Sequence, residues 1–130
     1  MSTLRQLTIQ LKQKLERLKK MYEENEPPES IKDKQFFLHM KEETAPVYEE
    51  LAQWEERVLD VVKEQRINLH PQQITSTKEN MELVILHSYY IDAREKRYME
   101  LYKSILYIFD QLLRSLETLQ HDDTGGQTDA

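Results

Sequence analysis

The sequence contains no cysteine among its 130 residues. This absence excludes disulfide crosslinks, thiolate zinc sites and cysteine nucleophiles. Glycine occurs only at Gly125 and Gly126, close to the C-terminus. A sheet protein needs turn residues between its strands, and phosphate-binding loops and serine-nucleophile elbows need glycine at fixed positions. The scarcity of glycine therefore favours an all-helical fold and argues against these enzyme motifs.

Long apolar runs are also missing. No segment approaches the roughly 20 consecutive apolar residues that a membrane-spanning helix needs. The net charge of −6 disfavours general binding to nucleic acid or to an anionic membrane surface. We therefore expect a cytoplasmic protein that binds neither nucleic acid nor membranes.

Apolar residues recur at intervals of three and four in four segments, which is the spacing of a helix that buries one face. A first helix is predicted from about Thr3 to Glu24, with its apolar stripe at Leu4, Leu7, Leu11, Leu15, Leu18 and Tyr22. A second helix is predicted after Pro46, with its stripe at Val47, Leu51, Trp54, Val58, Val61 and Gln65. Trp54 occupies a stripe position, so we expect it in the core.

A third helix is predicted to begin at Pro71, because proline suits the first helical position. Its stripe comprises Ile74, Thr77, Met81, Val84 and Ser88, and the additional apolar residues Leu83, Ile85 and Leu86 predict that it is the most buried helix. The stripe of the fourth helix comprises Tyr98, Leu101, Ile105, Ile108, Leu112, Leu116 and Leu119. An unbroken helix over residues 71–120 would be about 75 Å long, too long for one small core. We therefore predict a tight turn within residues 91–97, although no glycine or proline marks it.

The prolines and the polar C-terminus complete the predicted architecture. Pro27 and Pro28 end the first helix, and a short extra helix from Ile31 to about Glu43 is predicted to close one end of the core. Pro46 either begins the next helix or kinks one long helix. Residues 121–130 are polar and are predicted to be a disordered tail. The whole is predicted to be an all-α, up-and-down four-helix bundle over residues 1–120.

Dispersed residues over about 4–118 resemble the YppE-like family of small proteins from Bacillus and related bacteria. The resemblance rests on Phe36-Phe37, the spacing from Pro46 to Trp54, Leu69-His70 with Gln73-Ile74, Lys78-x-Asn80, Leu83-Val84 with Ser88-Tyr89, Lys96-Arg97, and Ser104-x-Leu106-Tyr107. It implies a four-helix bundle. It implies no established activity and brings no site residues with it.

The histidines do not form a recognisable metal or catalytic motif. None of His39, His70, His87 and His121 has a glutamate three residues before it, as the di-iron bundles require, and no two histidines are four residues apart. His87 and Glu82 are five residues apart and would not face each other on a helix. We therefore predict no catalytic residues, no metal and no cofactor, and a packed or exposed His87. The seven tyrosines are predicted to lie at the edge of the core, or alternatively to form a ligand-contact surface.

Charge is distributed unevenly along the chain. Residues 1–24 carry six basic and three acidic side chains, whereas residues 25–60 carry four basic and ten acidic ones. In an up-and-down bundle the first helix ends beside the turn between the third and fourth helices. That topology gathers five basic residues at one end, namely Lys19, Lys20, Arg94, Lys96 and Arg97. They are either a docking patch for an acidic partner or ordinary solvated charges that neutralise neighbouring acids.

These features favour a non-enzymatic helical bundle that binds another protein, as a monomer or a homodimer. The alternative is a small-molecule- or metal-binding four-helix bundle, and an enzyme with an unrecognised site is ranked last. A buried cavity lined by His87 and tyrosines would favour the alternative. A filled core with an exposed apolar patch would favour protein binding.

Overall fold

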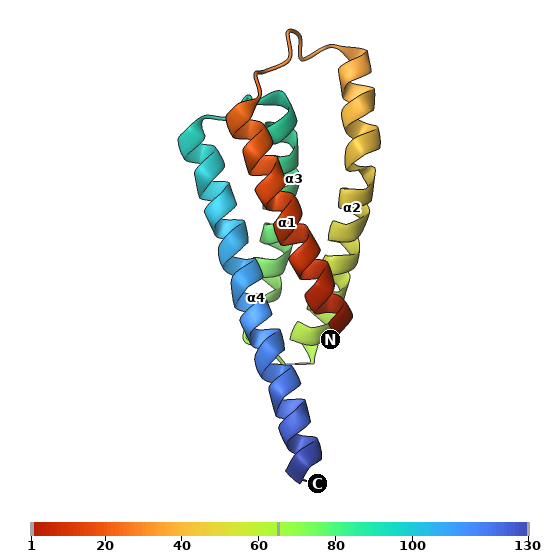
Figure 1. The fold of residues 1–130 in the computed structure, drawn as a ribbon, viewed down its shortest axis with the longest axis vertical. Coiled ribbons are helices and arrows are strands. Elements are labelled where there is room, and N and C mark those ends of the chain that lie inside the picture. The colour runs from red at the N-terminus through yellow and green to blue at the C-terminus, as the bar shows by residue number, and fades with distance from the viewer. Residues whose placement is uncertain (1, 65, 130) are drawn as a thin grey trace.

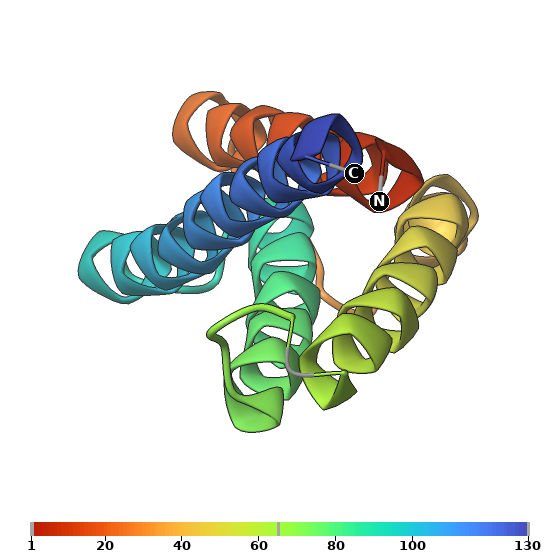
Figure 2. The ribbon, with the colours of Figure 1, turned by 90° about the horizontal axis from the view of Figure 1, so that it is seen from below.

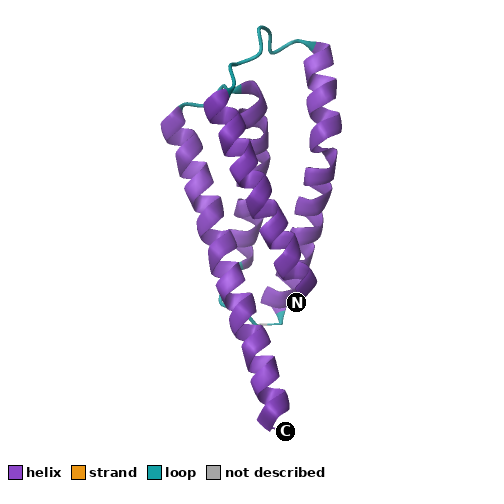
Figure 3. Ribbon diagram, viewed as in Figure 1, coloured by secondary structure: helices purple, strands orange, loops and turns teal. Residues whose placement is uncertain are grey.

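The computed structural model describes residues 2–64 and 66–129, with side chains described between Thr3 and Leu119. It contains four helices, α1 (Ser2–Glu24), α2 (Lys34–Lys63), α3 (Pro71–Tyr90) and α4 (Glu95–Asp129). Successive helices run in opposite directions (Figure 1), and every regular element of the described chain is helical (Figure 3). The predicted all-α four-helix fold is therefore confirmed.

The central pair of the bundle is α1 and α3. Each of them packs against all three other helices, whereas the backbones of α2 and α4 do not approach each other in the described chain. Figure 2 shows α2 and α4 on opposite sides of this pair. The predicted stripes supply the core, because Leu11, Leu51, Met81 and Ile105 are all 0% exposed. Burial of these stripes is the main force that holds the four helices together.

Trp54 connects three helices within this core. Its indole Nε1 donates a hydrogen bond to Thr8 Oγ1 of α1 at 3.0 Å, and Thr8 Oγ1 in turn donates to the Leu4 carbonyl oxygen at 2.8 Å. Its ring meets Phe109 of α4 edge-on, with 5.3 Å between ring centroids. A buried indole N–H needs such a partner. The prediction that Trp54 lies in the core is confirmed.

Residues 31–43 do not form a separate short helix, so that prediction is wrong. Pro46 lies inside the single helix α2, which is the second of the two arrangements that the sequence left open. The helix begins after Asp33, whose Oδ1 accepts hydrogen bonds from the amides of Gln35 and Phe36 at 3.0 and 3.2 Å. Pro46 is exposed, so the carbonyl that lacks an amide donor is near solvent and the helix can continue.

The predicted turn between the third and fourth helices is confirmed, and it occupies residues 91–94. Ile91 adopts the left-handed conformation, with φ 51° and ψ 44°, and its amide donates to the His87 carbonyl oxygen at 2.8 Å. Glycine usually occupies this position, because a β-branched residue is strained there. Asp92 Oδ1 lies 2.7 Å from His87 Nδ1 and ties the turn to the end of α3.

The outer face of α3 is more exposed than predicted. Leu83 and Leu86 are 36% and 38% exposed, whereas Ile85 is fully buried. Since α3 packs against α1, α2 and α4, three sides of the helix are covered and the fourth faces solvent. Of the three additional apolar residues only Ile85 is buried, so the prediction that Leu83 and Leu86 belong to a buried face of α3 is wrong.

The last turns of α4 project beyond the other helices and reach Asp129 (Figure 1). The side chains of residues 120–130 lie outside the described part of the chain, so the disorder predicted for 121–130 stays a prediction. None of the described helices combines the length and the apolar content that crossing a membrane requires.

A pair of matched truncations should distinguish the core from the outer face of α3. Ile105→Ala should lower the free energy of unfolding by about 2–5 kcal/mol, because it leaves a cavity in a closed core. Leu83→Ala should cost less than about 1 kcal/mol, because that side chain is already in contact with water. Urea denaturation of both variants measures the difference, and equal losses would contradict the assigned core.

Removing residues 121–130 should change the melting temperature by less than about 2 °C, because no predicted core position lies in this segment. Circular dichroism of the full and shortened chains measures the effect. A clearly larger drop would show that these residues stabilise the bundle and are not a disordered tail.

Candidate functional site

One end of the bundle brings together the end of α1, the beginning of α2 and the turn between α3 and α4 (Figure 1). We call it the upper end, and it comprises residues 19–41 and 86–98. The Tyr22 ring stacks on Tyr98, with 3.9 Å between centroids and 2° between planes. The Tyr22 hydroxyl donates a hydrogen bond to the Ala93 carbonyl oxygen. The end of α1 therefore lies against the turn between α3 and α4, as the topology predicted.

The five basic residues singled out from the sequence all belong to this end. Two are on the last turns of α1, one is in the turn and two are on the first turn of α4, namely Lys19, Lys20, Arg94, Lys96 and Arg97. Asp92 and Glu95 lie among them. Burial of Tyr22, followed by the negative charges of Glu95 and Asp92, raises the pKa of Tyr22. The surface therefore mixes both signs of charge and is not uniformly basic.

Two of these five residues are already engaged within the protein. Lys19 Nζ lies 3.4 Å from a Glu23 carboxylate oxygen and 5.3 Å from the centroid of the Tyr102 ring. Arg97 is 3.9 Å from Glu100. Exposed pairs of this kind stabilise a protein by about 1 kcal/mol or less, so they compete only weakly with a binding partner. A role for the five residues in binding stays a prediction.

The upper end also carries an apolar patch, which we define as Ile31, Phe37 and Leu38. These side chains are 70%, 46% and 52% exposed. The sequence predicts that this segment closes one end of the core, and only part of the segment does so. Met40 is 6% exposed, and Phe36 meets Tyr90 edge-on at 5.2 Å. The remaining three large apolar side chains face solvent.

The exposure of the apolar patch follows from the relative positions of the helices. In Figure 1 the first turns of α2 rise beyond the ends of the other three helices and stand apart from α1. The sequence did hold a signal for this arrangement. Phe36, Phe37 and Leu38 are consecutive, and three consecutive residues point to different sides of a helix. One buried face cannot cover all three, which distinguishes them from the evenly spaced stripes.

Two buried tyrosines near this end have structural roles. Tyr98 is fully buried and its hydroxyl lies 2.6 Å from Ser88 Oγ. Burial raises the pKa of Tyr98 to about 12, although the hydrogen bond with Ser88 acts in the opposite direction. Burial and a hydrogen bond to Glu16 raise the pKa of Tyr102 to about 12. Both phenols are protonated at neutral pH and are bonded within the protein.

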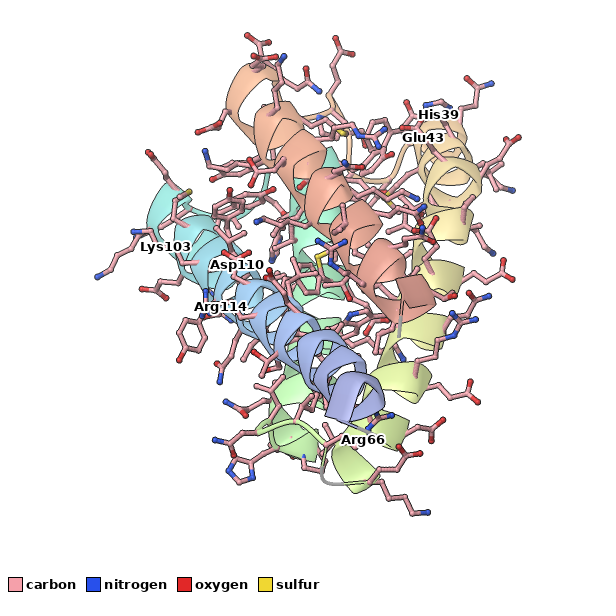
Figure 4. The ribbon with its side chains drawn as sticks, turned by 60° about the horizontal axis from the view of Figure 1, so that its bottom comes forward. His39, Glu43, Arg66, Lys103, Asp110 and Arg114 are labelled. Carbon is pink, nitrogen blue, oxygen red and sulfur yellow. The ribbon has the colours of Figure 1, made fainter. Side chains whose placement is uncertain are left out.

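A short chain of polar contacts borders the apolar patch. Glu43 accepts a hydrogen bond from the Tyr89 hydroxyl at 2.6 Å, and its other carboxylate oxygen lies 2.8 Å from His39 Nε2. Figure 4 shows His39 and Glu43 side by side near the start of α2. Burial, followed by the bond to Glu43, raises the pKa of Tyr89, so its phenol stays a donor. These contacts fix the first turns of α2 against the end of α3.

His39 and His70 are exposed at the surface of the bundle, and the side chain of His121 lies outside the described residues. His87 is half-buried and contacts Asp92 in the turn, which agrees with a packed or exposed histidine. Among the side chains described between Thr3 and Leu119, no group of three from histidine, aspartate and glutamate is arranged to hold a metal ion.

Known proteins share both the sequence pattern and the fold. Residues 8–116 match the family described as "Bacterial domain of unknown function (DUF1798)". No curated protein matches the chain.

Two solved structures of the protein YppE from Bacillus subtilis resemble the chain. Its crystal structure matches with a TM-score of 0.74 and its solution NMR structure with 0.75. Each is 23% identical in sequence, and the match covers 95% of this chain and 97% of that one. At this identity the likeness establishes the fold alone. Because the family model matches most of the chain, this protein belongs to the DUF1798, or YppE-like, family of bacterial proteins of unknown function.

Proposed function

We propose that this protein is a non-enzymatic interaction module that binds another protein through the apolar patch. The observation that carries the proposal is the exposure of three large apolar side chains, Ile31, Phe37 and Leu38, at one end of the bundle. Large apolar side chains that remain in contact with water mark a surface that a partner can cover. The four stripes fill the core, and a filled core with exposed apolar side chains favours protein binding over a buried ligand site.

The surroundings of the patch indicate the chemistry of the partner. Lys32, Lys34 and Lys41 are exposed and lie within four residues of the patch along the chain. Glu29 and Glu42 are exposed within the same distance, and Asp33 is occupied in capping α2. An apolar centre with a charged rim is the usual organisation of a protein interface. The partner is therefore proposed to present an apolar anchor surrounded by charged side chains of both signs.

The five basic residues fit the same proposal as an outer contact. They lie at the same upper end as the apolar patch, although on the other helices (Figure 1). Exposed charges steer association more than they contribute to affinity. We therefore assign the anchoring role to the patch and a steering role to Lys19, Lys20, Arg94, Lys96 and Arg97. Such a partner is a different protein or a second copy of this chain.

The anchoring role can be tested by placing a photo-crosslinking amino acid at position 38 in the native host and identifying the protein that it captures. Binding of that purified protein is then measured for Leu38→Glu and for the matched control Leu83→Glu. Leu83 is also exposed and apolar, at 36% against 52% for Leu38, but lies on the outer face of α3 away from the upper end. Leu38→Glu should weaken binding at least about tenfold, and Leu83→Glu should leave it unchanged.

Reversing the charges of Lys19 and Lys20 to glutamate should slow association and leave dissociation nearly unchanged. Sedimentation of the protein alone identifies the case in which the partner is a second copy. The proposal fails if the captured protein binds Leu38→Glu with the affinity of the unmodified chain.

A further inference from the structure

A groove of about 480 Å³ runs between the first half of α3 and the middle of α4. Sites for small molecules usually have volumes of about 300–1,000 Å³. Six uncharged polar side chains line it, three with amides and three with hydroxyls, namely Gln72, Gln73, Asn80, Ser76, Thr77 and Ser104. It lies away from the upper end and from the apolar patch, so it is a separate surface.

Short side chains account for the groove. Near the upper end, Tyr98 fills the space between α3 and α4 by reaching Ser88. Farther along the same two helices, Ser76 and Thr77 of α3 and Ser104 of α4 line the wall, and none of them is long enough to bridge the helices. Ile108 belongs to the lining as well and is 7% exposed, so the groove reaches down to the packed core.

The charge of the groove is unlike that of the protein as a whole. The net charge of the chain is −6, yet no aspartate or glutamate lines the groove, and Lys103 does. Lys12 is held by Asp110 at 2.7 Å, whereas Lys103 forms no ion pair within the described residues. Figure 4 shows Lys103 on the outer side of α4. A cation beside uncharged walls favours an anionic ligand.

The groove also holds a hydrogen-bond donor in a fixed position and an exposed ring. Gln73 Oε1 accepts the amide hydrogen of His70 at 2.9 Å, which orients the side-chain amide and leaves its Nε2 as a donor. Tyr107 lines the groove and is 60% exposed. A tyrosine ring offers an apolar face on which a flat or ring-shaped ligand can pack. Gln111 follows Tyr107 by one helical turn, and its Oε1 is buried without a hydrogen-bond partner in the described chain.

We propose that this groove binds a small, hydroxyl-rich organic anion of the sugar phosphate or sugar acid class. Lys103 would hold the phosphate or carboxylate, the amides would bond the hydroxyl groups, and the Tyr107 ring would pack against the sugar ring. Amide side chains suit hydroxyl groups because each amide both donates and accepts hydrogen bonds. This inference is independent of the proposed binding of a protein partner.

The test is a titration of the ¹⁵N-labelled full chain with glucose 6-phosphate, glucuronate, glucose and inorganic phosphate, followed by NMR. We expect saturable shifts of the Gln73 and Asn80 side-chain amide signals with glucose 6-phosphate or glucuronate, and the stronger of these two identifies the anionic group. Glucose and inorganic phosphate should each bind at least about tenfold more weakly, because each supplies only half of the required contacts.

Three variants connect the shifts to the groove. Lys103→Gln should weaken binding at least about tenfold and Tyr107→Ala about fivefold, while the control Arg57→Gln, which removes an exposed cation from α2, should have no effect. All three positions are exposed, so the fold is retained, as circular dichroism would verify. The proposal is overturned if neither sugar anion gives saturable shifts up to about 20 mM, or if glucose or phosphate alone binds as tightly. Equal affinity of Lys103→Gln and the unmodified chain would overturn it as well.

Discussion

The contact between α1 and α3 is the constraint on which the rest of the bundle depends. These two helices pack against each other and against both remaining helices, whereas the backbones of α2 and α4 do not approach each other within the described chain. Leu11 and Leu15 of α1 and Met81 and Ile85 of α3 are fully buried as a result. Because α2 and α4 are each packed on one side, their outer faces remain available for charged residues and, at the start of α2, for the apolar patch.

Trp54 limits the freedom of this arrangement. Through its edge-on contact with Phe109, a side chain of α2 reaches α4. Its indole N–H requires Thr8, and Thr8 is itself bonded to the helix backbone at Leu4. A shift of α1 along α2 would separate Trp54 from Thr8 and leave the buried indole N–H without a hydrogen-bond partner. This bond therefore fixes the axial position of the two helices more strictly than leucine packing does. The apolar stripes therefore hold the helices together, and this bond aligns α1 with α2.

The length of an unbroken helix over residues 71–120 predicted the turn within residues 91–97. Periodic spacing predicted the four stripes, because burial of one helical face imposes that spacing. It did not decide the role of Pro46, since a proline is tolerated inside a helix where the freed carbonyl is near solvent, and exposure is a property of the assembled fold. Nor did it separate Leu83 from Ile85, because spacing reports which residues are apolar and not which sides of a helix are covered. The left-handed Ile91 carries no sequence signal, as its conformation is held by contacts with the end of α3.

The candidate surfaces were predictable to different degrees, because one depends only on the order of the helices and the others depend on their relative positions. An up-and-down topology alone places Lys19 beside Arg97, so the basic residues of the upper end followed from the order of the helices. The apolar patch depends on how far α2 extends beyond its neighbours, and the groove depends on which short side chains face each other across α3 and α4. Both depend on how the helices are positioned along and around their axes relative to one another, which the spacing of apolar residues does not report. The patch lies at the start of α2 and the groove between α3 and α4. An effect of one ligand on the other can therefore pass through α1 or α3, which both pack against α2 and α4, or through the contact of Trp54 with Phe109. If these elements have one arrangement each, the two surfaces are energetically independent, because a ligand couples two sites only if it stabilises one arrangement of the elements between them over another.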